Sequence, residues 1–106
     1  MRALPVTFAA LGDTTRFAIV ERLLKEGELS AGELQDVADI SAPAISRHFK
    51  VLRNAGIIEQ RIDKQRRMYS VRPEAVREIN SWAIGYVEFW DNSFDRLAAA
   101  LMNSEE

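Results

Sequence analysis

Two helix start signals that stand only eleven residues apart constrain the fold of this chain more than any other feature. The first is the pair Ser30 and Glu33, a capping box in which each side chain accepts a hydrogen bond from the other residue's backbone N–H. The second is Ser41, an N-cap followed by Pro43, which a helix tolerates in its first turn. Only a short helix, from Ser30 to about Ala38, and a tight turn fit between them. The spacing therefore predicts a helix-turn-helix over residues 30–55.

The second helix of this pair has one apolar face. Ile45, Phe49 and Leu52 recur at helical spacing, and Gly56 ends the helix. If these three side chains point into the core, a turn of about 100° per residue brings small and basic residues to the opposite face and its margins. Those residues are Pro43, Ala44, Ser46, Arg47, His48, Lys50 and Arg53. Such a face suits the major groove of double-stranded DNA.

Individual residues of this face suit different parts of a duplex. Arg47 can pair with O6 and N7 of guanine, and Ser46 can bind either a base or a phosphate. Ala44, at the margin of the face, can contact a thymine methyl group. Lys50 and Arg53 lie farther along the helix, where phosphates are the expected partners.

Hydrophobicity alternates after Gly56, through Ile58 and Ile62 and then Tyr69 and Val71. This pattern predicts a two-stranded β-hairpin over residues 57–72, a wing beside the helix-turn-helix. The residues near its tip are Lys64, Gln65, Arg66 and Arg67. They can reach an adjacent minor groove or its phosphates, or they can simply keep a hairpin edge soluble.

The charges are unevenly distributed along the chain. Residues 47–72 hold eight basic and two acidic side chains, a net charge of +6, whereas the whole chain has a net charge of −2. The remainder therefore carries −8. This distribution predicts one face that binds phosphates on an otherwise acidic body.

Apolar residues at helical spacing also predict helices at both ends of the chain. Residues 4–11 form the first, and the second begins at the N-cap Asp13, places Phe17, Val20 and Leu24 on one face, and ends at Gly27. Residues 74–103 follow Pro73 without a further proline and carry a long apolar stripe.

Unbroken, this last helix would be about 45 Å long, whereas a compact domain of this size has a radius of gyration of roughly 13 Å. A second copy of the chain is the expected cover for its far end. The alternative is a break near Gly85 or at residues 91–93, with the two halves folded back on the monomer. The residues expected at the dimer interface are Leu4, Phe8, Ile79, Trp82, Ala83, Tyr86, Trp90, Phe94, Leu97 and Leu101. The aromatic run can instead line a ligand pocket.

The residue content argues against catalysis and metal chemistry. The chain has no cysteine, and its one histidine, His48, cannot build a usual zinc site alone. His48 lies at the border of the two helix faces, where it can donate to a phosphate or to a backbone carbonyl. No glycine-rich phosphate loop or nucleophile motif occurs, so neither an enzyme nor a cofactor is expected. We expect a cytoplasmic protein, since no leader and no run of about 18 apolar residues is present.

Three stretches of sequence resemble the ArsR/SmtB-type bacterial repressors. They are Leu11-Gly12-Asp13-Thr14-Thr15-Arg16, Gly27-Glu28-Leu29-Ser30-Ala31-Gly32-Glu33-Leu34, and Ser46 to Ile58, which reads SRHFKVLRNAGII. The resemblance covers nearly the whole chain. It implies dimerisation through the first and last helices and repression from an inverted-repeat operator. Metal-responsive members carry cysteines where this chain has Ser30 and Gly32, so the chain resembles the metal-independent branch.

We therefore expect one mainly α (α+β) domain spanning residues 1–106, a winged helix-turn-helix with about five helices, a two-stranded β-hairpin wing and a long C-terminal dimerisation helix. The expected partners are double-stranded DNA and a second copy of the chain, with an unknown small-molecule or protein inducer as a further candidate. The alternatives are a winged helix that binds another protein and a repressor with a ligand site in its aromatic interface.

Overall fold

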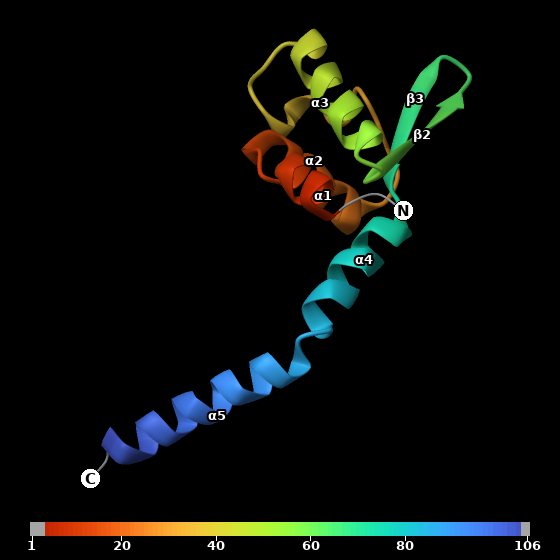
Figure 1. Ribbon diagram of the computed structural model, residues 1–106. Coiled ribbons are helices and arrows are strands. Elements are labelled where there is room, and N and C mark those ends of the chain that lie inside the picture. Colours follow the sequence, from red (N-terminus) through yellow and green to blue (C-terminus); the bar gives the residue numbers. More distant parts are fainter. Residues whose placement is uncertain (1–3, 105–106) are drawn as a thin grey trace.

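The computed structural model describes residues 4–104, which form a compact head and a long helical arm (Figure 1). The described part measures 66 × 31 × 21 Å, and its radius of gyration is 18.6 Å. The helices are α1 (Leu4–Leu11), α2 (Thr14–Glu26), α3 (Ala42–Asn54), α4 (Pro73–Ile84) and α5 (Val87–Ser104), with a short 3₁₀ helix η1 (Gln35–Val37). The strands are β1 (Leu29–Ser30), β2 (Ile58–Asp63) and β3 (Arg66–Val71). The predicted winged helix-turn-helix is confirmed.

The core lies where α2, α3 and the sheet meet. Ile45, Phe49 and Leu52 are each at most 2% exposed, which confirms the predicted inner face of α3. Phe49 reaches the sheet, with its ring centroid 4.4 Å from that of Tyr69 on β3. The orientation of α3 is thus set by packing against both a helix and the wing.

The buried face of α2 differs in part from the predicted one. In α2 the buried residues are Ile19, Val20 and Leu23, whereas Phe17 and Leu24 are about half exposed. In α1 the small residues Thr7 and Ala10 face the core. Periodicity alone allowed either face of α2, because apolar residues occur around most of it. The Gly27 end is as expected: φ is +83° there, and its N–H bonds to Leu23 O at 2.9 Å.

The capping box forms, but the α-helix predicted after it does not. Glu33 N–H donates to Ser30 Oγ (3.1 Å), and Ser30 N–H donates to Glu33 Oε1 (3.0 Å). The chain then makes a turn and the 3₁₀ helix η1 in place of an α-helix to Ala38. Leu34, which is fully buried, anchors this segment. So short a segment gives the i→i−4 pattern too few hydrogen bonds to compete with this tertiary contact.

The wing has a third strand that the sequence pattern did not reveal. The antiparallel sheet has the order β1-β3-β2, and Leu29 of β1 stands opposite Tyr69. Two residues carry no detectable alternation, so only the pairing in space defines β1. The predicted hairpin itself is confirmed, with Asp63 opposite Arg66 across a two-residue turn.

The C-terminal segment is two helices that do not fold back on the head. The break lies at Gly85 and Tyr86, and α5 runs without interruption through residues 91–93. Trp90 Nε1 donates to Ala83 O (3.3 Å) across the break. Figure 1 shows α5 extending away from the head. The prediction of one continuous helix is therefore wrong at Gly85, a poor helix former. The alternative is right about a break near Gly85 and wrong about the two halves folding back on the monomer. In the described part of the chain, no helix has the length and apolar character needed to span a membrane.

Candidate nucleic-acid interface

Helix α3 presents its polar face to solvent. Ser41 caps the helix by accepting a hydrogen bond from the N–H of Ala44 (3.3 Å). Ser46, Arg47 and Lys50 are exposed on the side opposite the core residues. Pro43 is also exposed, and Ala44 is half-buried at the margin. The predicted outward face is therefore present in the structure.

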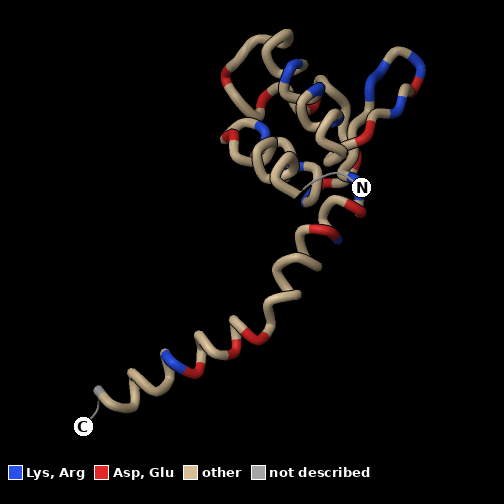
Figure 2. The backbone as a smooth tube through the Cα atoms, viewed as in Figure 1, with Lys and Arg blue, Asp and Glu red and all other residues tan. Residues whose placement is uncertain are grey.

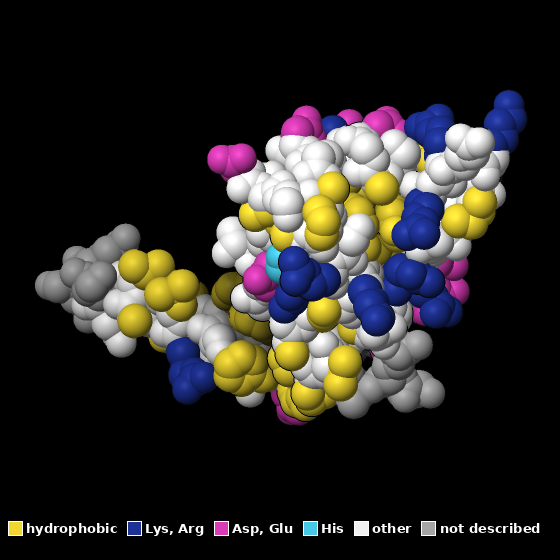
Figure 3. Space-filling view, turned by 90° about the horizontal axis from the view of Figure 1, so that it is seen from above, with side chains coloured by type: hydrophobic (Ala, Val, Ile, Leu, Met, Phe, Trp, Pro, Cys, Tyr) yellow, Lys and Arg dark blue, Asp and Glu magenta, His cyan; other side chains and the backbone are white. Residues whose placement is uncertain are grey.

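A hollow of about 420 Å³ lies between α3 and the wing. Its lining residues are Ser46, Arg47, Phe49, Lys50, Arg53, Asn54, Arg67 and Tyr69. Lysine and arginine side chains gather on this end of the head (Figure 3). The backbone view shows basic positions along the hairpin and mostly acidic charged positions on α4 and α5 (Figure 2). The charge separation predicted from the sequence thus becomes a separation in space.

Three basic residues of the segment 47–72 form ion pairs with carboxylates. Arg61 pairs with Glu28 (2.7 Å), Arg66 with Glu33 (3.2 Å) and Arg72 with Glu74 (3.7 Å). The basic residues of the segment that form no ion pair with any described carboxylate are Arg47, Lys50, Arg53, Lys64 and Arg67. Unpaired cations attract a polyanion most strongly, so this second set is the candidate surface for phosphate contacts.

The pKa values of Glu28 and Glu33, the two carboxylates that flank β1, are both lowered. The hydrogen bonds from Arg61 lower the pKa of Glu28. The pKa of Glu33 is lowered first by the N–H of Ser30 and less by the nearby charge of Arg66. The two ion pairs join the wing to the residues that flank β1. Sequence patterns could not reveal these pairs, because each joins residues 33 positions apart.

The wing tip carries a strained lysine. Lys64 has φ of +60° and is the one non-glycine residue with positive φ in residues 4–104. A side chain in this region costs about 1 kcal/mol or more, and glycine avoids that cost. The chain thus has a cation at a turn position where glycine would make the protein more stable.

We expect Lys64→Gly to raise the free energy of unfolding by about 0.5–1 kcal/mol, as measured by urea denaturation, while weakening binding to any duplex. Gln65→Gly is the matched control, since Gln65 lacks positive φ and its replacement should give no gain. An equal gain from both substitutions would show that Lys64 is not strained.

His48 is partly buried and its side chain is bonded inside the head. Its Nδ1 lies 3.2 Å from Nη1 of Arg16, a residue of α2 that sequence reasoning did not single out. Asp13 Oδ1 lies 3.9 Å from the same nitrogen. The structure thus places His48 toward α2, away from the exposed row that contains Ser46, Arg47 and Lys50.

Seven of the ten apolar residues predicted at a dimer interface are exposed, and all but Phe8 of these lie on the arm. Phe8 of α1 contacts Trp82 of α4, with ring centroids 5.5 Å apart. Along α5, Trp90 and Phe94 stack with centroids 6.4 Å apart. A hollow of about 310 Å³ at the α4–α5 break is lined by Trp82, Ala83, Tyr86, Phe89 and Trp90. Leu4, Ile79 and Ala83 are half-buried, and Leu97 and Leu101 are exposed.

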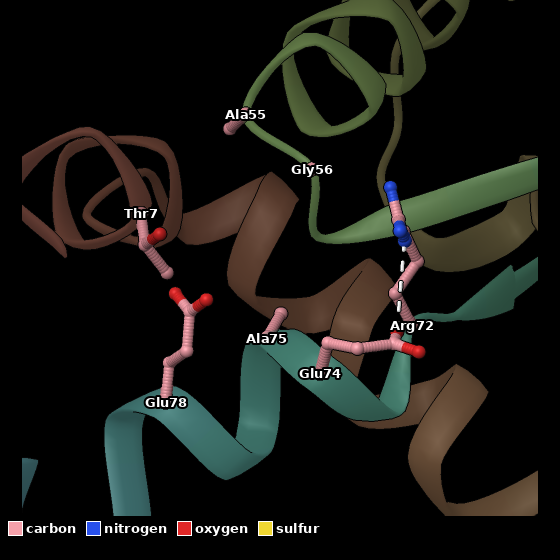
Figure 4. A pocket seen from close by; sticks show the side chains of 7 residues that line it. All are labelled: Thr7, Ala55, Gly56, Arg72, Glu74, Ala75 and Glu78. Atoms are coloured by element: carbon pink, nitrogen blue, oxygen red, sulfur yellow. Dashed lines mark ion pairs between the residues drawn. The ribbon is translucent and has the colours of Figure 1, made fainter. Parts of the chain in front are cut away.

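A further hollow of about 310 Å³ lies where the head meets α4. Figure 4 shows Glu78 pointing toward Thr7, and the Arg72–Glu74 ion pair at the other side. Charges of both signs line it. In residues 4–104, no three histidine or acidic side chains lie together in a way that could hold a metal ion.

A helix-turn-helix whose outward helix stands beside a cationic β-hairpin defines a winged-helix protein of the DNA-binding class. Comparison with known proteins supports this class, since a family model described as a helix-turn-helix domain matches residues 11–61. The chain belongs to the ArsR family of DNA-binding transcriptional regulators.

Two curated relatives and one solved structure illustrate the family. The arsenic resistance transcriptional regulator ArsR1 of Pseudomonas putida is 36% identical over 84 residues, which are 79% of this chain and 66% of that protein. The transcriptional repressor SdpR of Bacillus subtilis is 32% identical over 85 residues, 80% of this chain and 93% of that protein. A solved ArsR family transcriptional regulator has a TM-score of 0.73 and 27% identity, covering 83% of this chain and 90% of its own.

Proposed function

We propose that this chain is a homodimeric repressor that binds an inverted-repeat DNA site and needs no metal to do so. The observation that carries the proposal is the group of unpaired cations Arg47, Lys50, Arg53 and Arg67 between α3 and β3, beside the helix that a helix-turn-helix places in the major groove. In this assignment Pro43, Ala44, Ser46 and Arg47 meet base edges. The residues assigned to phosphates are Lys50, Arg53, Lys64, Gln65 and Arg67.

Arg66 is a weaker candidate for a phosphate contact than Arg67. Its guanidinium is already paired with Glu33, so a phosphate must compete with that carboxylate. The two groups are about half exposed, and such surface pairs are weak, so a closely placed phosphate can replace the carboxylate. We therefore assign Arg67 to the phosphate surface first and Arg66 second.

The exposed arm supports the homodimer. The large apolar side chains of α5 include Phe94, Leu97 and Leu101, which are 57–63% exposed. Burying a leucine or phenylalanine side chain stabilises an assembly by about 1.5–3 kcal/mol. A second copy buries the same residues twice by symmetry. Residues 4–11 and 74–103 are thus proposed as the dimerisation segments around the DNA-binding residues 30–72.

Metal independence rests on the chemistry of the available ligands. The Pseudomonas putida relative is an arsenic resistance regulator. Soft metal ions prefer thiolates, and this chain contains no cysteine. The match to SdpR covers 93% of that protein, more than the 66% covered in ArsR1, and SdpR is a transcriptional repressor.

Selection of bound duplexes from a random pool, with EDTA present throughout, tests the whole proposal. We expect a palindromic consensus whose half-sites lie about one helical turn apart, because two copies of α3 must enter successive major grooves. No enrichment, or enrichment only without EDTA, would contradict it. Binding to an acidic protein but to no duplex would favour the protein-docking alternative.

Arg47→Ala should weaken binding to the selected duplex by about 1–3 kcal/mol and relax the base preference at one position of each half-site. The reason is the loss of a bidentate pair with guanine. Arg53→Ala is the matched control: it should weaken selected and scrambled duplexes alike and reduce the salt dependence of binding. Fluorescence anisotropy at several salt concentrations measures both. Equal losses on the two duplexes for Arg47→Ala would remove it from base recognition.

A further inference from the structure

We propose that Arg16 and His48 form a positioning contact that fixes the outward helix α3 relative to α1, and thereby relative to the second protomer. This inference rests on the homodimer of the proposed function. The polar cluster around Arg16 and His48 lies inside the head and joins the proposed DNA-binding face to the proposed dimer interface.

One arginine side chain joins three helices in this cluster. Arg16 Nε donates to Ala10 O (2.7 Å), a carbonyl in the last turn of α1. Carbonyls at a helix end lack partners within the helix, so this bond anchors α1 to α2. The Nη1 group of the same guanidinium lies 3.2 Å from His48 Nδ1 on α3.

The contact determines which nitrogen of His48 carries the proton. Arginine has only N–H donors, so the facing Nδ1 must offer its lone pair. The proton of the neutral imidazole is then on Nε2. Asp13 balances the guanidinium: its Oδ2 lies 4.0 Å from Arg16 Nη1, and its pKa is lowered first by the hydrogen bond from the N–H of Arg16.

His48 points toward Arg16 inside the head, on a different side of α3 from the residues proposed to contact DNA. Two residues along an α-helix turn by about 200°, so His48 and Lys50 point to nearly opposite sides of α3. The side chains of His48 and Arg16 are 22% and 19% exposed, which shields their hydrogen bond from water. The expectation that His48 binds a phosphate is therefore replaced, in this proposal, by a positioning role.

The link extends to the arm through α1. Phe8 of α1 packs edge-on against Trp82 of α4, in the region proposed as the dimer interface. Displacing α1 therefore displaces Ala10 O, Arg16 and the histidine on α3. The distance between the two copies of α3 decides which half-site spacing fits, because successive major grooves lie about 34 Å apart. Arg16 and His48 thus set the spacing preference.

The protonation state can be read in the free protein. His48 is the only histidine, so ¹⁵N NMR of the imidazole reports one residue. We expect the signature of a ring that carries its proton on Nε2 and has an unprotonated Nδ1, without any DNA. A ring protonated at Nδ1 would overturn the contact, whatever the protein does on DNA.

Two substitutions of similar shape separate the positioning role from a phosphate contact. In His48→Asn, the oxygen of the introduced amide can replace Nδ1 and accept from Arg16. In His48→Gln, the longer side chain instead places its amide where the outward Nε2–H was and loses that acceptor. The probes are the selected duplex, versions with one base pair added or removed between half-sites, and a duplex with a single half-site.

We expect the wild-type protein and His48→Asn to discriminate against altered spacing equally. His48→Gln should lose about fivefold of that discrimination, the effect of one hydrogen bond, while its single half-site affinity stays the same. The opposite order, with His48→Asn impaired and His48→Gln normal, would overturn the proposal in favour of a phosphate contact. If His48→Gln does not fold, loss of spacing discrimination in His48→Asn overturns it. If the wild-type protein binds duplexes of every half-site spacing equally, the proposed homodimer is wrong. The NMR measurement then still shows whether His48 Nδ1 accepts a hydrogen bond from Arg16.

Discussion

Leu97→Glu should make the protein monomeric and weaken its binding to a palindromic duplex at least about a hundredfold. Leu97 is 57% exposed on the apolar stripe of α5. In a symmetric dimer each substitution counts twice, so the loss of two leucines from the interface amounts to about 3–6 kcal/mol. Two glutamates in an apolar seam add the cost of burying unpaired charge. Sedimentation gives the mass, and anisotropy gives the affinity.

Ala99→Glu is the matched control for this change. Ala99 is exposed on the same helix, and two residues of rotation place it on the far side from Leu97. It adds the same charge to the same segment, so its variant should remain dimeric and bind the duplex normally. The Leu97 variant should still bind a single half-site. A dimeric Leu97→Glu protein would remove α5 from the interface.

Phe49→Ala should lower the free energy of unfolding by about 3–5 kcal/mol, the usual cost of truncating a buried phenylalanine. Phe49 is 2% exposed, and its ring lies 4.4 Å from that of Tyr69. The loss is large because the same side chain belongs to the core and joins α3 to the wing. Urea denaturation measures it, with the protein concentration held fixed because the stability of any oligomer depends on concentration.

Ile62→Ala provides the comparison within the wing. Ile62 is 58% exposed on β2, so its truncation should change the free energy of unfolding by no more than about 0.5 kcal/mol. If the two substitutions cost the same, Phe49 is not the connection between α3 and the sheet. A loss of the expected size for Phe49→Ala would show that the contact between α3 and the sheet contributes to the stability of the head.

Much of the candidate interface could be predicted from local patterns. The spacing of Ile45, Phe49 and Leu52 correctly predicted which face of α3 is outward, and the alternation around Asp63 predicted the hairpin. The capping bonds between Ser30 and Glu33 also form as predicted. Each of these features depends on residues close together in the chain, which is why a pattern could reveal it.

Other features depend on contacts between distant segments. The pairing of Arg66 with Glu33 separates it from the free cations, and the bond from Arg16 to His48 joins residues 32 positions apart. Neither has a signature in residue spacing. The strand β1 is similar, because two residues become a strand only when β3 lies beside them.

The amino-acid sequence alone determined that a small-and-basic helix face and a cationic hairpin follow one another, because helical and strand periodicities are local properties. Only the tertiary structure decided which cations are left unpaired, which face of α2 is buried, and that the arm extends away from the head instead of folding back. Those outcomes depend on competition between packing and local preference, and packing wins wherever a segment is short or apolar on several sides.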